Sequence, residues 1–282
     1  MNSFSAVIIR WFRENGRDLP WRETRDSYAI WLSEIILQQT RIAQGWEYWE
    51  RFMQTYPKVE DLAAASEDDV LKLWQGLGYY SRARNLHTAA KQIVALGDFP
   101  NTLEGIKSLK GVGDYTAAAI GSFAFGIPAA VVDGNVYRVL SRYFGIDTPI
   151  NSTQGKKEFA ALAQSLLPAS DAASYNQGMM DFGAIQCTPQ SPKCLLCPLA
   201  ETCEALRCGR VEELPVKNKT VKVKTRHLSY IYIRCKSSAA DGAGNSEPMV
   251  AIHRRGEGDI WQGLWEPYNA VSYTHLRAHE TG

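Results

Sequence analysis

Apolar residues recur every three or four positions through most of the first 210 residues, and short breaks rich in glycine, proline, asparagine and aspartate separate the periodic segments. This spacing predicts amphipathic helices, and no segment in this part of the chain alternates like a half-buried strand. The clearest predicted helices are Tyr28–Arg41, Asp68–Leu73, Ala83–Ala95, Thr116–Phe125, Val136–Phe144 and Lys156–Leu167. The first part of the chain is therefore predicted to be mainly α.

The pattern changes after Pro215. Residues 216–226 carry five Lys and Arg and no Asp or Glu, and we interpret them as a basic linker. The segments His227–Cys235 and Met249–Arg254 then look like strands of a second domain over residues 227–270. About 50 residues are few for an independent core, so this domain is expected to be incomplete. Residues 271–282 fit neither periodicity and are interpreted as a non-native tail.

Composition and charge narrow the class of protein. Of the 282 residues, 45% are hydrophobic and 22% charged, so extensive disorder is excluded. No apolar run approaches the ~20 residues of a membrane span, and the start has no charged leader, so we expect a cytoplasmic protein without a membrane partner. The net charge is +1, but Lys and Arg outnumber Asp and Glu by 8 to 4 from Cys187 to Arg226. Any surface that binds a polyanion is therefore expected to be local.

Five of the six cysteines lie within 22 residues, and the first 186 residues have none. The spacing is Cys187-x6-Cys194-x2-Cys197-x5-Cys203, with no histidine in the segment. One close pair flanked by two single cysteines suits a [4Fe–4S] cube, whose four irons each take one sulfur, better than zinc, which usually takes two close pairs. Zinc and disulfides remain the alternatives.

A glycine turn, Leu109-Lys-Gly-Val-Gly-Asp-Tyr-Thr116, lies between two predicted helices. Gly111 and Gly113 permit positive φ and close approach, and the free N–H groups of the helix that Thr116 opens point back at the turn. That geometry suits a nucleic-acid phosphate, bound without reading sequence. A tight turn between helices is the alternative, but the flanking residues match the helix–hairpin–helix motif of DNA-binding enzymes.

Two carboxylates are the candidate catalytic groups. Glu34 has apolar neighbours on both sides, so its helix should be buried, which raises the pKa of a carboxyl group until it holds a proton near neutral pH. Asp133 precedes the predicted helix that begins at Val136, where backbone N–H groups favour the ionised form. A proton donor and a fixed negative charge cleave glycosidic bonds through an oxocarbenium-like state. The structural alternatives are an N-cap role for Asp133 and an ion pair of Glu34 with Arg41 or another arginine.

Together these features resemble the adenine DNA glycosylase family, which removes adenine opposite 8-oxoguanine or guanine. The resemblance covers about residues 5–270, and its motifs are specific to the family. They are Leu19-Pro-Trp-Arg22, Trp31-Leu-Ser-Glu-Ile-Ile-Leu-Gln-Gln-Thr40, Gly76-Leu-Gly-Tyr-Tyr-Ser-Arg-Ala-Arg-Asn85, the glycine turn, Val132-Asp-Gly-Asn-Val136 and the four cysteines.

The resemblance implies a mainly α, helix–hairpin–helix glycosylase fold. A six-helix barrel domain would cover about residues 21–132, and an iron–sulfur cluster domain would combine residues 1–20 with 133–215. A truncated α+β, Nudix-like domain would follow at 227–270. The cofactor would be a [4Fe–4S] cluster on Cys187, Cys194, Cys197 and Cys203. The partner would be double-stranded DNA with A·8-oxoguanine or A·G mispairs, and the protein would be a monomer of the bacterial cytoplasm.

The resemblance also implies roles for single residues. Glu34 would protonate N7 of an adenine flipped out of the duplex, and Asp133 would stabilise the positive sugar. Asn135 and Tyr115 would support this chemistry through hydrogen bonds. The expected substrate and DNA contacts are Arg22, Leu37, Gln39, Thr40, Tyr79, Arg82, Gly111, Gly113 and Thr116. Gln39 and Tyr79 would fill or wedge the base stack; two core tyrosines, Tyr79 and Tyr80, are the alternative.

Tyr115 separates two related families. Endonuclease III, with the same cluster, carries a lysine after Gly-Val-Gly-x, whose amine forms a Schiff base with the sugar and cuts the strand. A phenol cannot form that imine, and Lys110 is misplaced for it, so we expect a monofunctional glycosylase. The segment Trp261–Pro267 resembles the early hairpin of a Nudix-like module that recognises 8-oxoguanine. Two other functions stay open: an endonuclease III-like lyase and a non-enzymatic iron–sulfur protein that senses redox state on DNA.

Overall fold

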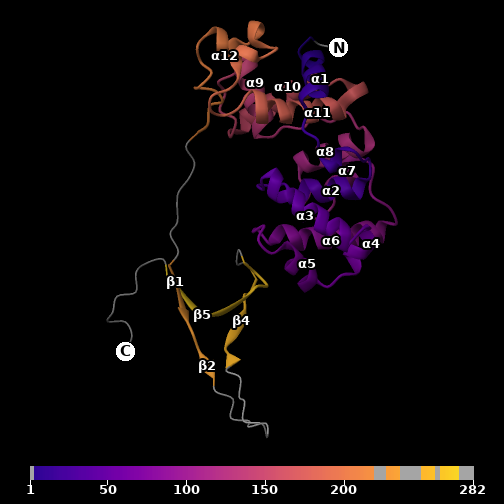
Figure 1. The fold of residues 1–282 in the computed structure, drawn as a ribbon, viewed down its shortest axis with the longest axis vertical. Helices are drawn as coiled ribbons and strands as arrows, with labels where there is room; N and C mark the ends of the chain where they lie inside the picture. The colour runs from indigo at the N-terminus through magenta and orange to yellow at the C-terminus, as the bar shows by residue number, and fades with distance from the viewer. Residues whose placement is uncertain (1–2, 219–226, 236–248, 258–260, 273–282) are drawn as a thin grey trace. The chain divides into compact units, whose positions relative to one another are not determined.

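The computed structural model describes residues 3–218, 227–235, 249–257 and 261–272. The chain divides into two compact units, one made of Met1–Leu77 with Arg82–Lys219 and the other of Gly78–Ser81 with Thr220–Gly282. Among the described residues the first unit is helical, and the strands lie in the second (Figure 1). No helix in these ranges is long and apolar enough to cross a membrane.

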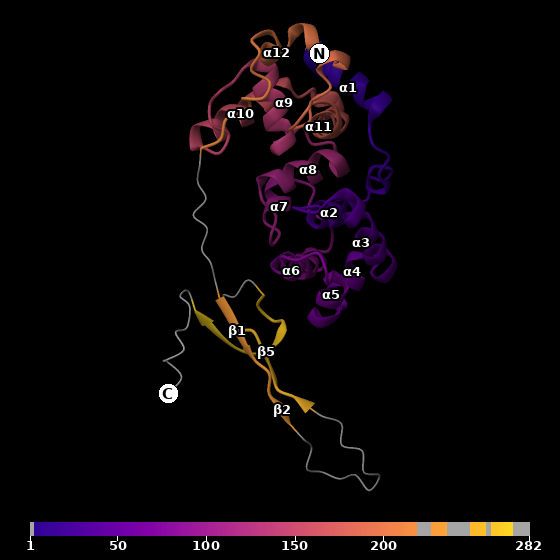
Figure 2. The same cartoon turned by 60° about the vertical axis from the view of Figure 1, so that its left-hand side comes forward.

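The helices of the first unit form two groups, which Figure 1 and Figure 2 show at opposite ends of that unit. The first group comprises η1 (Pro20–Arg22), α2 (Ser27–Ile36), α3 (Ile42–Thr55), α4 (Val59–Ala64), α5 (Glu67–Trp74), α6 (Ser81–Leu96), α7 (Leu103–Lys107) and α8 (Asp114–Phe125). The second comprises α1 (Ser3–Asn15), α9 (Gly134–Phe144), α10 (Thr153–Leu166), η2 (Ala169–Asp171), α11 (Ala172–Asp181), the π-helical turn η3 (Phe182–Gln186), η4 (Cys194–Leu196), η5 (Ala200–Thr202) and α12 (Glu204–Arg207). The split between a barrel domain and a cluster domain stays a prediction.

Helix α2 is the centre of the first group. It packs against α3 and α8, and every residue from Tyr28 to Ile36 is buried. A helix that is apolar all round is stable only inside a protein, so Glu34 enters the core with its neighbours. Asp26 is the N-cap of this helix, and its carboxylate accepts a hydrogen bond from the Tyr28 N–H at 3.0 Å.

The second group packs around α1 and α11. Phe4, Ile8 and Trp11 lie at three- and four-residue spacing on α1 and are buried in the same core as Val136 and Leu140 of α9. This packing fixes the start of α9, where the chain carries Asp133.

The predicted helix Tyr28–Arg41 is wrong at its carboxyl end. Helix α2 ends at Ile36, Gln39 has a left-handed φ of 57°, and a new helix, α3, begins at Ile42. A left-handed residue cannot continue a right-handed helix. The break turns this segment into a loop at the edge of the cavities described below.

In the second unit, β1 (His227–Ile231) and β4 (Ile252–Arg254) both pair antiparallel with β5 (Trp265–Ser272), and β2 (Arg234–Cys235) pairs with β3 (Met249–Val250). Strand β5 extends to Val271 and Ser272, which pair with β1, and the interpretation of residues 271–282 as a non-native tail stays a prediction. Residues 273–282 lie outside the described ranges. The Nudix-like assignment stays a prediction.

Part of the predicted linker belongs to the helical unit. The Val216 carbonyl accepts from the Ile150 N–H at 3.0 Å, and Asn218 exchanges two hydrogen bonds of 2.9 Å with the Asn151 side chain. Residues 219–226 lie outside the described ranges.

Candidate active site and cysteine cluster

Glu34, Tyr115 and Asp133 come from three different elements and line the same cavity. Glu34 lies near the end of α2, Tyr115 in the first turn of α8, and Asp133 at the N-cap of α9. The cavity has about 310 Å³, and a second one, of about 470 Å³, shares these three side chains. The first volume matches that of small-ligand sites. The expected site residues that line at least one of the two are Arg22, Glu34, Leu37, Gln39, Thr40, Tyr115, Asp133 and Asn135.

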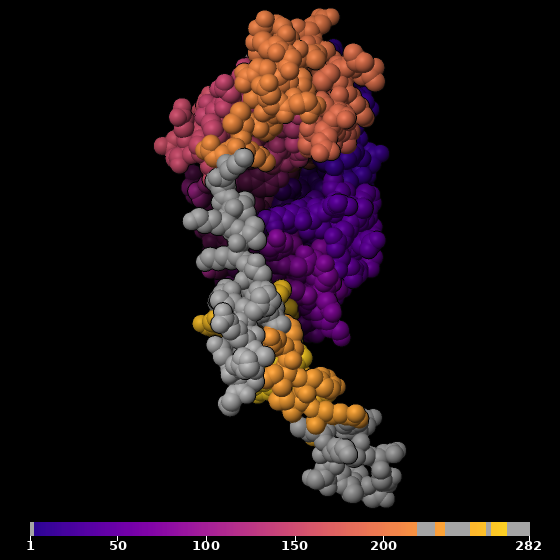
Figure 3. Space-filling model, turned by 90° about the vertical axis from the view of Figure 1, so that its left-hand side faces the viewer, coloured from indigo at the N-terminus to yellow at the C-terminus, as the bar shows by residue number. Residues whose placement is uncertain are grey.

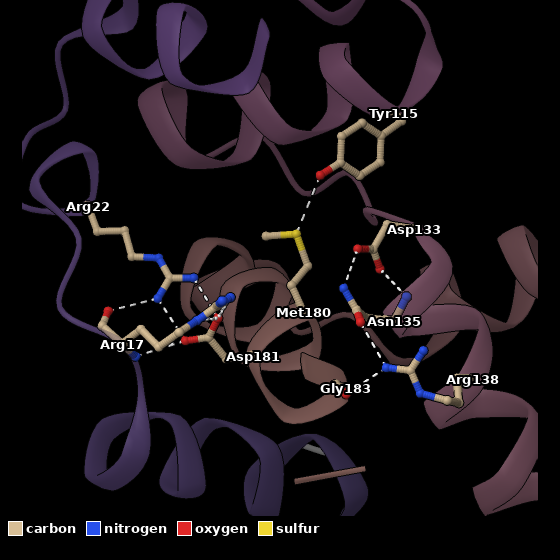
Figure 4. Close-up of polar contacts among 9 residues, drawn as sticks. All are labelled: Arg17, Arg22, Tyr115, Asp133, Asn135, Arg138, Met180, Asp181 and Gly183. Carbon is tan, nitrogen blue, oxygen red and sulfur yellow. Dashed lines mark hydrogen bonds and ion pairs between the residues drawn. The ribbon is translucent and has the colours of Figure 1, made fainter. Parts of the chain in front are cut away.

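The environment of Glu34 keeps a proton available near neutral pH. Its side chain is 9% exposed, and burial raises its pKa from 4.5 to about 7. The Arg22 guanidinium and a hydrogen bond from Tyr115 act against this rise in pKa, while the Asp133 charge adds to it. Burial also raises the pKa of Tyr115 well above its usual value, so the phenol stays protonated; its hydroxyl also lies 3.5 Å from Met180 Sδ (Figure 4).

Asp133 is the N-cap of α9, and three donors hold its carboxylate. The N–H groups of Asn135 and Val136 each donate to Oδ1 at 2.8 Å, and Asn135 Nδ2 donates to Oδ2 at 2.8 Å. These donors and the positive end of the helix suit an ionised carboxylate. The expected capping role is therefore confirmed, and it leaves Asp133 in the wall of the cavity.

Asn135 is held in turn by Arg138, a buried residue that the sequence analysis missed. Arg138 Nη2 donates to Asn135 Oδ1 at 2.8 Å and to the Gly183 carbonyl at 2.6 Å (Figure 4). Its Nε donates to the carbonyl of Cys187 at 2.7 Å. One guanidinium thus joins Asn135 beside the cavity to the beginning of the cysteine segment.

Asp181 is a second missed residue beside the cavity. Its fully buried carboxylate binds the guanidinium groups of Arg17 and Arg22, which both line the cavity (Figure 4). The signal was in the sequence, because Asp181 lies between Met180 and Phe182 in an apolar segment, as Glu34 does in its own.

The two residues expected to wedge the base stack share an unusual backbone conformation with a positive φ. Gln39 and Tyr79 have φ values of 57° and 47°, which side-chain-bearing residues adopt only when their surroundings impose it. Tyr79 is 63% exposed, so the alternative of a core tyrosine is wrong for it.

Arg82, an expected DNA contact, binds the protein's own backbone. Its Nη1 donates to the carbonyls of Ile35 and Ile36, at 3.2 and 3.1 Å, and to that of Gln38. Its Nη2 donates to the Leu77 carbonyl at 3.2 Å. Arg82 therefore caps the end of α2 and ties this end to the segment before Tyr79.

The glycine turn has the expected form. Gly111 has a φ of 81°, and a Cβ there would lie 2.7 Å from Asn85 Cβ, so only glycine fits. Gly113 is the N-cap of α8 and has open space around it. Thr116 is 3% exposed and accepts a weak bond from Gln38 Nε2 at 3.4 Å, so its side chain faces the protein interior.

The four cysteines of the predicted cluster line one small cavity of about 30 Å³. They lie around η4 and η5, in an orange segment that Figure 3 shows at the surface of the helical unit. None of these four forms a disulfide, which removes one of the alternatives. In the part of the chain that the structure describes, no three His, Cys, Asp or Glu side chains are arranged to hold a single metal ion.

The donor set fits an iron–sulfur cube. Four sulfurs around one cavity can each ligate a different iron. Burial raises the pKa of Cys197 to about 11, so bound iron has to displace the thiol protons. The buried Arg142 lies 3.5 Å from Cys187 Sγ through Nη1 and also donates to the Thr188 carbonyl at 2.7 Å, which places a cation beside the thiolates.

Comparison with known proteins first defines the class. Residues 32–168 match the model of the HhH-GPD superfamily of base excision DNA repair proteins, and residues 187–203 match the iron–sulfur binding domain of endonuclease III. The structure resembles a thermostable thymine-DNA glycosylase, with a TM-score of 0.68 and 34% identity over 73% of this chain and 95% of that one. An endonuclease III trapped as a covalent intermediate on DNA shares the fold, with a TM-score of 0.63 and 23% identity. The chain is thus a DNA glycosylase that carries a [4Fe–4S] cluster.

The particular family follows from sequence identity. The adenine DNA glycosylase of Buchnera aphidicola subsp. Acyrthosiphon pisum is 39% identical over an alignment of 265 residues, which covers 93% of this chain and 73% of that protein. The human adenine DNA glycosylase is 42% identical over 76% of this chain, but this chain spans only 41% of the human protein. The chain belongs to the adenine DNA glycosylase family.

Proposed function

We propose that this protein hydrolyses the N-glycosidic bond of adenine mispaired with 8-oxoguanine or guanine in duplex DNA and leaves an abasic site. The observation that carries the proposal is the shared cavity of Glu34, Tyr115 and Asp133. It unites a protonated carboxyl group, a neutral hydrogen-bond donor and a carboxylate, and the chain's family removes adenine.

Glu34 is the general acid. Adenine has to leave the duplex, because its glycosidic bond cannot be reached inside the base stack. The proton of Glu34 moves to N7 of the flipped base, the bond between C1′ and N9 breaks, and its electron pair stays on the purine. With a pKa of about 7, Glu34 can lose its proton in this step and accept one in the next.

Asp133 stabilises the cation that remains on the sugar. Its carboxylate is held by backbone and Asn135 donors, so it does not have to reorganise when positive charge develops. Water then attacks C1′ and gives one proton to the ionised Glu34, which restores the starting state. Asn135 orients Asp133, and the Tyr115 hydroxyl orients Glu34.

The lining of the cavities favours a monofunctional enzyme. No lysine occurs among the described residues that line either cavity with Glu34. Lys110 is exposed, and its N–H donates to Gln92 Oε1 at 2.7 Å on the turn. Without an amine beside the sugar, no Schiff base forms and the strand stays intact.

The DNA contacts are proposed from the same geometry. The N–H groups at the start of α8, beside Gly111 and Gly113, hold a backbone phosphate. Gln39 and Tyr79 enter the space that the flipped adenosine leaves. The β unit is proposed to be the beginning of a Nudix-like module that reads the base opposite adenine.

The test is single-turnover release of free adenine from duplexes with one A·8-oxoguanine or A·G pair. Glu34→Gln and Asp133→Asn are each expected to lower the rate at least ~10³-fold, since each removes a group that acts in bond cleavage. Glu23→Gln, an exposed neighbour, and Asp171→Asn, a surface ion-pair partner, are the matched controls. Wild-type rates in both active-site variants would refute the assignment.

A second measurement distinguishes a monofunctional glycosylase from a glycosylase that also cuts the DNA strand as a lyase. Borohydride reduces a Schiff base and traps the enzyme on DNA. We expect no trapped adduct and no strand cleavage from the wild-type protein. An adduct that disappears in Lys110→Met would instead assign an endonuclease III-like activity.

A further inference from the structure

Asp181, the last residue of α11, has a fully buried carboxylate, and its partners among the residues that the structure describes are two arginines. It accepts from the backbone N–H and Nε of Arg17 at 2.9 Å each, and also from Arg17 Nη2. Arg22 Nη1 and Nη2 each donate to it at 2.8 Å. These contacts engage both carboxylate oxygens.

The stability of the fold does not require a buried carboxylate with two arginines at this position. Burying charges carries a large desolvation penalty, and well-packed apolar residues often do as well for stability. By comparison, Arg13 of α1 and Asp171 of η2 make an ordinary ion pair at 3.2 Å, with side chains 70% and 28% exposed. The buried group instead lies against the cavity, since Arg17, Arg22 and Met180 all line it.

We propose that Asp181 is a positioning residue that holds Arg17 and Arg22 in the cavity wall, so that Glu34 faces one net positive charge there rather than two. The proposal rests on the proposed function, because it assigns Asp181 to the control of the general acid. The group of two guanidiniums and one carboxylate has a net charge of +1.

Other ionisable groups from neighbouring elements also line the cavity with Glu34. They are Arg41 at the N-cap of α3, Tyr115 in the first turn of α8 and Asp133 at the N-cap of α9. Of these, Asp133 raises the pKa of Glu34 and the hydrogen bond of Tyr115 lowers it, while Arg22 is the cation that lowers it most. A change in charge at Asp181 therefore acts beside the strongest electrostatic partner of Glu34.

The direction of the effect follows from the charges. Asp181→Asn removes the counter-ion and leaves two guanidiniums beside Glu34, which favours its ionised form. The acid then loses its proton at a lower pH, so adenine release declines earlier as the pH rises. Arg17→Met removes one cation instead and shifts the same limb in the opposite direction. The double variant restores a net charge of +1 and is expected to return the limb toward that of the wild type.

The experiment measures the single-turnover rate of adenine release between pH 5.5 and 9 for the wild type, both single variants and the double variant. We expect the alkaline limb of Asp181→Asn to lie about one pH unit below that of the wild type, and the limb of Arg17→Met to lie above it. Asp171→Asn is the control and should leave the limb in place. A purely structural role would lower rates at every pH without moving the limb.

Several outcomes would overturn the proposal. If Asp181→Asn folds, as judged by its melting curve and cluster absorption, and its limb coincides with that of the wild type, Asp181 does not act on Glu34. If that variant does not fold, an unmoved or downward-shifted limb in Arg17→Met has the same meaning. Full activity of Glu34→Gln would refute the proposed function itself, whereas an inactive Glu34→Gln with an unmoved limb in Asp181→Asn refutes only this inference.

Discussion

Replacing Glu34 by Gln should stabilise this protein while it abolishes adenine release. The folded state raises the pKa of Glu34 from 4.5 to about 7, so it binds this proton more tightly than the unfolded chain does. The contribution of Glu34 to stability is therefore complete below pH 4.5 and is lost as the pH rises to about 7. Above pH 7 the buried carboxylate costs about 3 kcal/mol of unfolding free energy, at about 1.4 kcal/mol for each pH unit of the shift.

Glutamine has nearly the same shape and does not titrate, so the comparison isolates this cost. Relative to the wild type, Glu34→Gln should gain about 2 kcal/mol of stability between pH 5.5 and pH 8.5. In a domain of this size that gain raises the melting temperature by roughly 4 °C or more. The loss of the Glu34 hydrogen bond shifts the variant by an amount that does not depend on pH, so it does not affect the slope.

The assay is the melting temperature at 222 nm, at one scan rate and several pH values, for the wild type, Glu34→Gln and Glu23→Gln. The exposed Glu23 should show no pH-dependent difference from the wild type. A difference between Glu34→Gln and the wild type that stays constant within about 0.5 kcal/mol over this range would show that Glu34 has an ordinary pKa, and the general-acid argument would fail with it.

Three further predictions follow from other contacts. Arg22→Met removes the cation that lowers the pKa of Glu34, so the alkaline limb of the pH–rate profile should move to higher pH; a limb at lower pH would contradict the sign of this interaction. Cys203→Ser should lose the visible absorption of the cluster and melt at a lower temperature, whereas Cys208→Ser, outside the cavity, should keep both; equal spectra for the two would exclude Cys203 as a ligand. Arg82→Met leaves several backbone carbonyls without their donor and should cost about 2 kcal/mol in stability and slow base flipping, measured with a fluorescent purine. Lys91 is exposed on the same helix, and Lys91→Met should change neither the stability nor the rate of base flipping. If Arg82→Met also leaves both unchanged, the hydrogen bonds of Arg82 to these carbonyls do not stabilise the protein.

The candidate site shows which signals a sequence can carry. Glu34 was found because a carboxylate in an apolar helix is anomalous, and Asp133 because it precedes a helix at a capping position. Asp181 satisfies the first rule as well, but nothing in its local pattern reveals the two arginines that neutralise it. These partners come from η1 and from the segment between α1 and η1, more than 150 residues away in the chain.

The geometry of the loops was the second feature that the sequence could not predict. The periodicity of Tyr28–Arg41 predicted one helix, because a left-handed residue leaves no trace in the spacing of apolar positions. The contacts of Arg82, which was expected to bind DNA, could not be read from the sequence either. Its four acceptors are backbone carbonyls. Every residue has such a carbonyl, so the sequence does not indicate which of them a side chain will contact.

Local chemistry was determined by the sequence alone: the helical period, the glycine turn, the four closely spaced cysteines and the two anomalous carboxylates all depend on residues near one another in the chain. The tertiary structure decided which of these groups share a cavity, which arginine faces which carboxylate, and hence how tightly Glu34 holds its proton. The reason is physical, since burial and electrostatic interaction depend on distances in space between α2, α8, α9 and α11, and these distances exist only once the helices have packed.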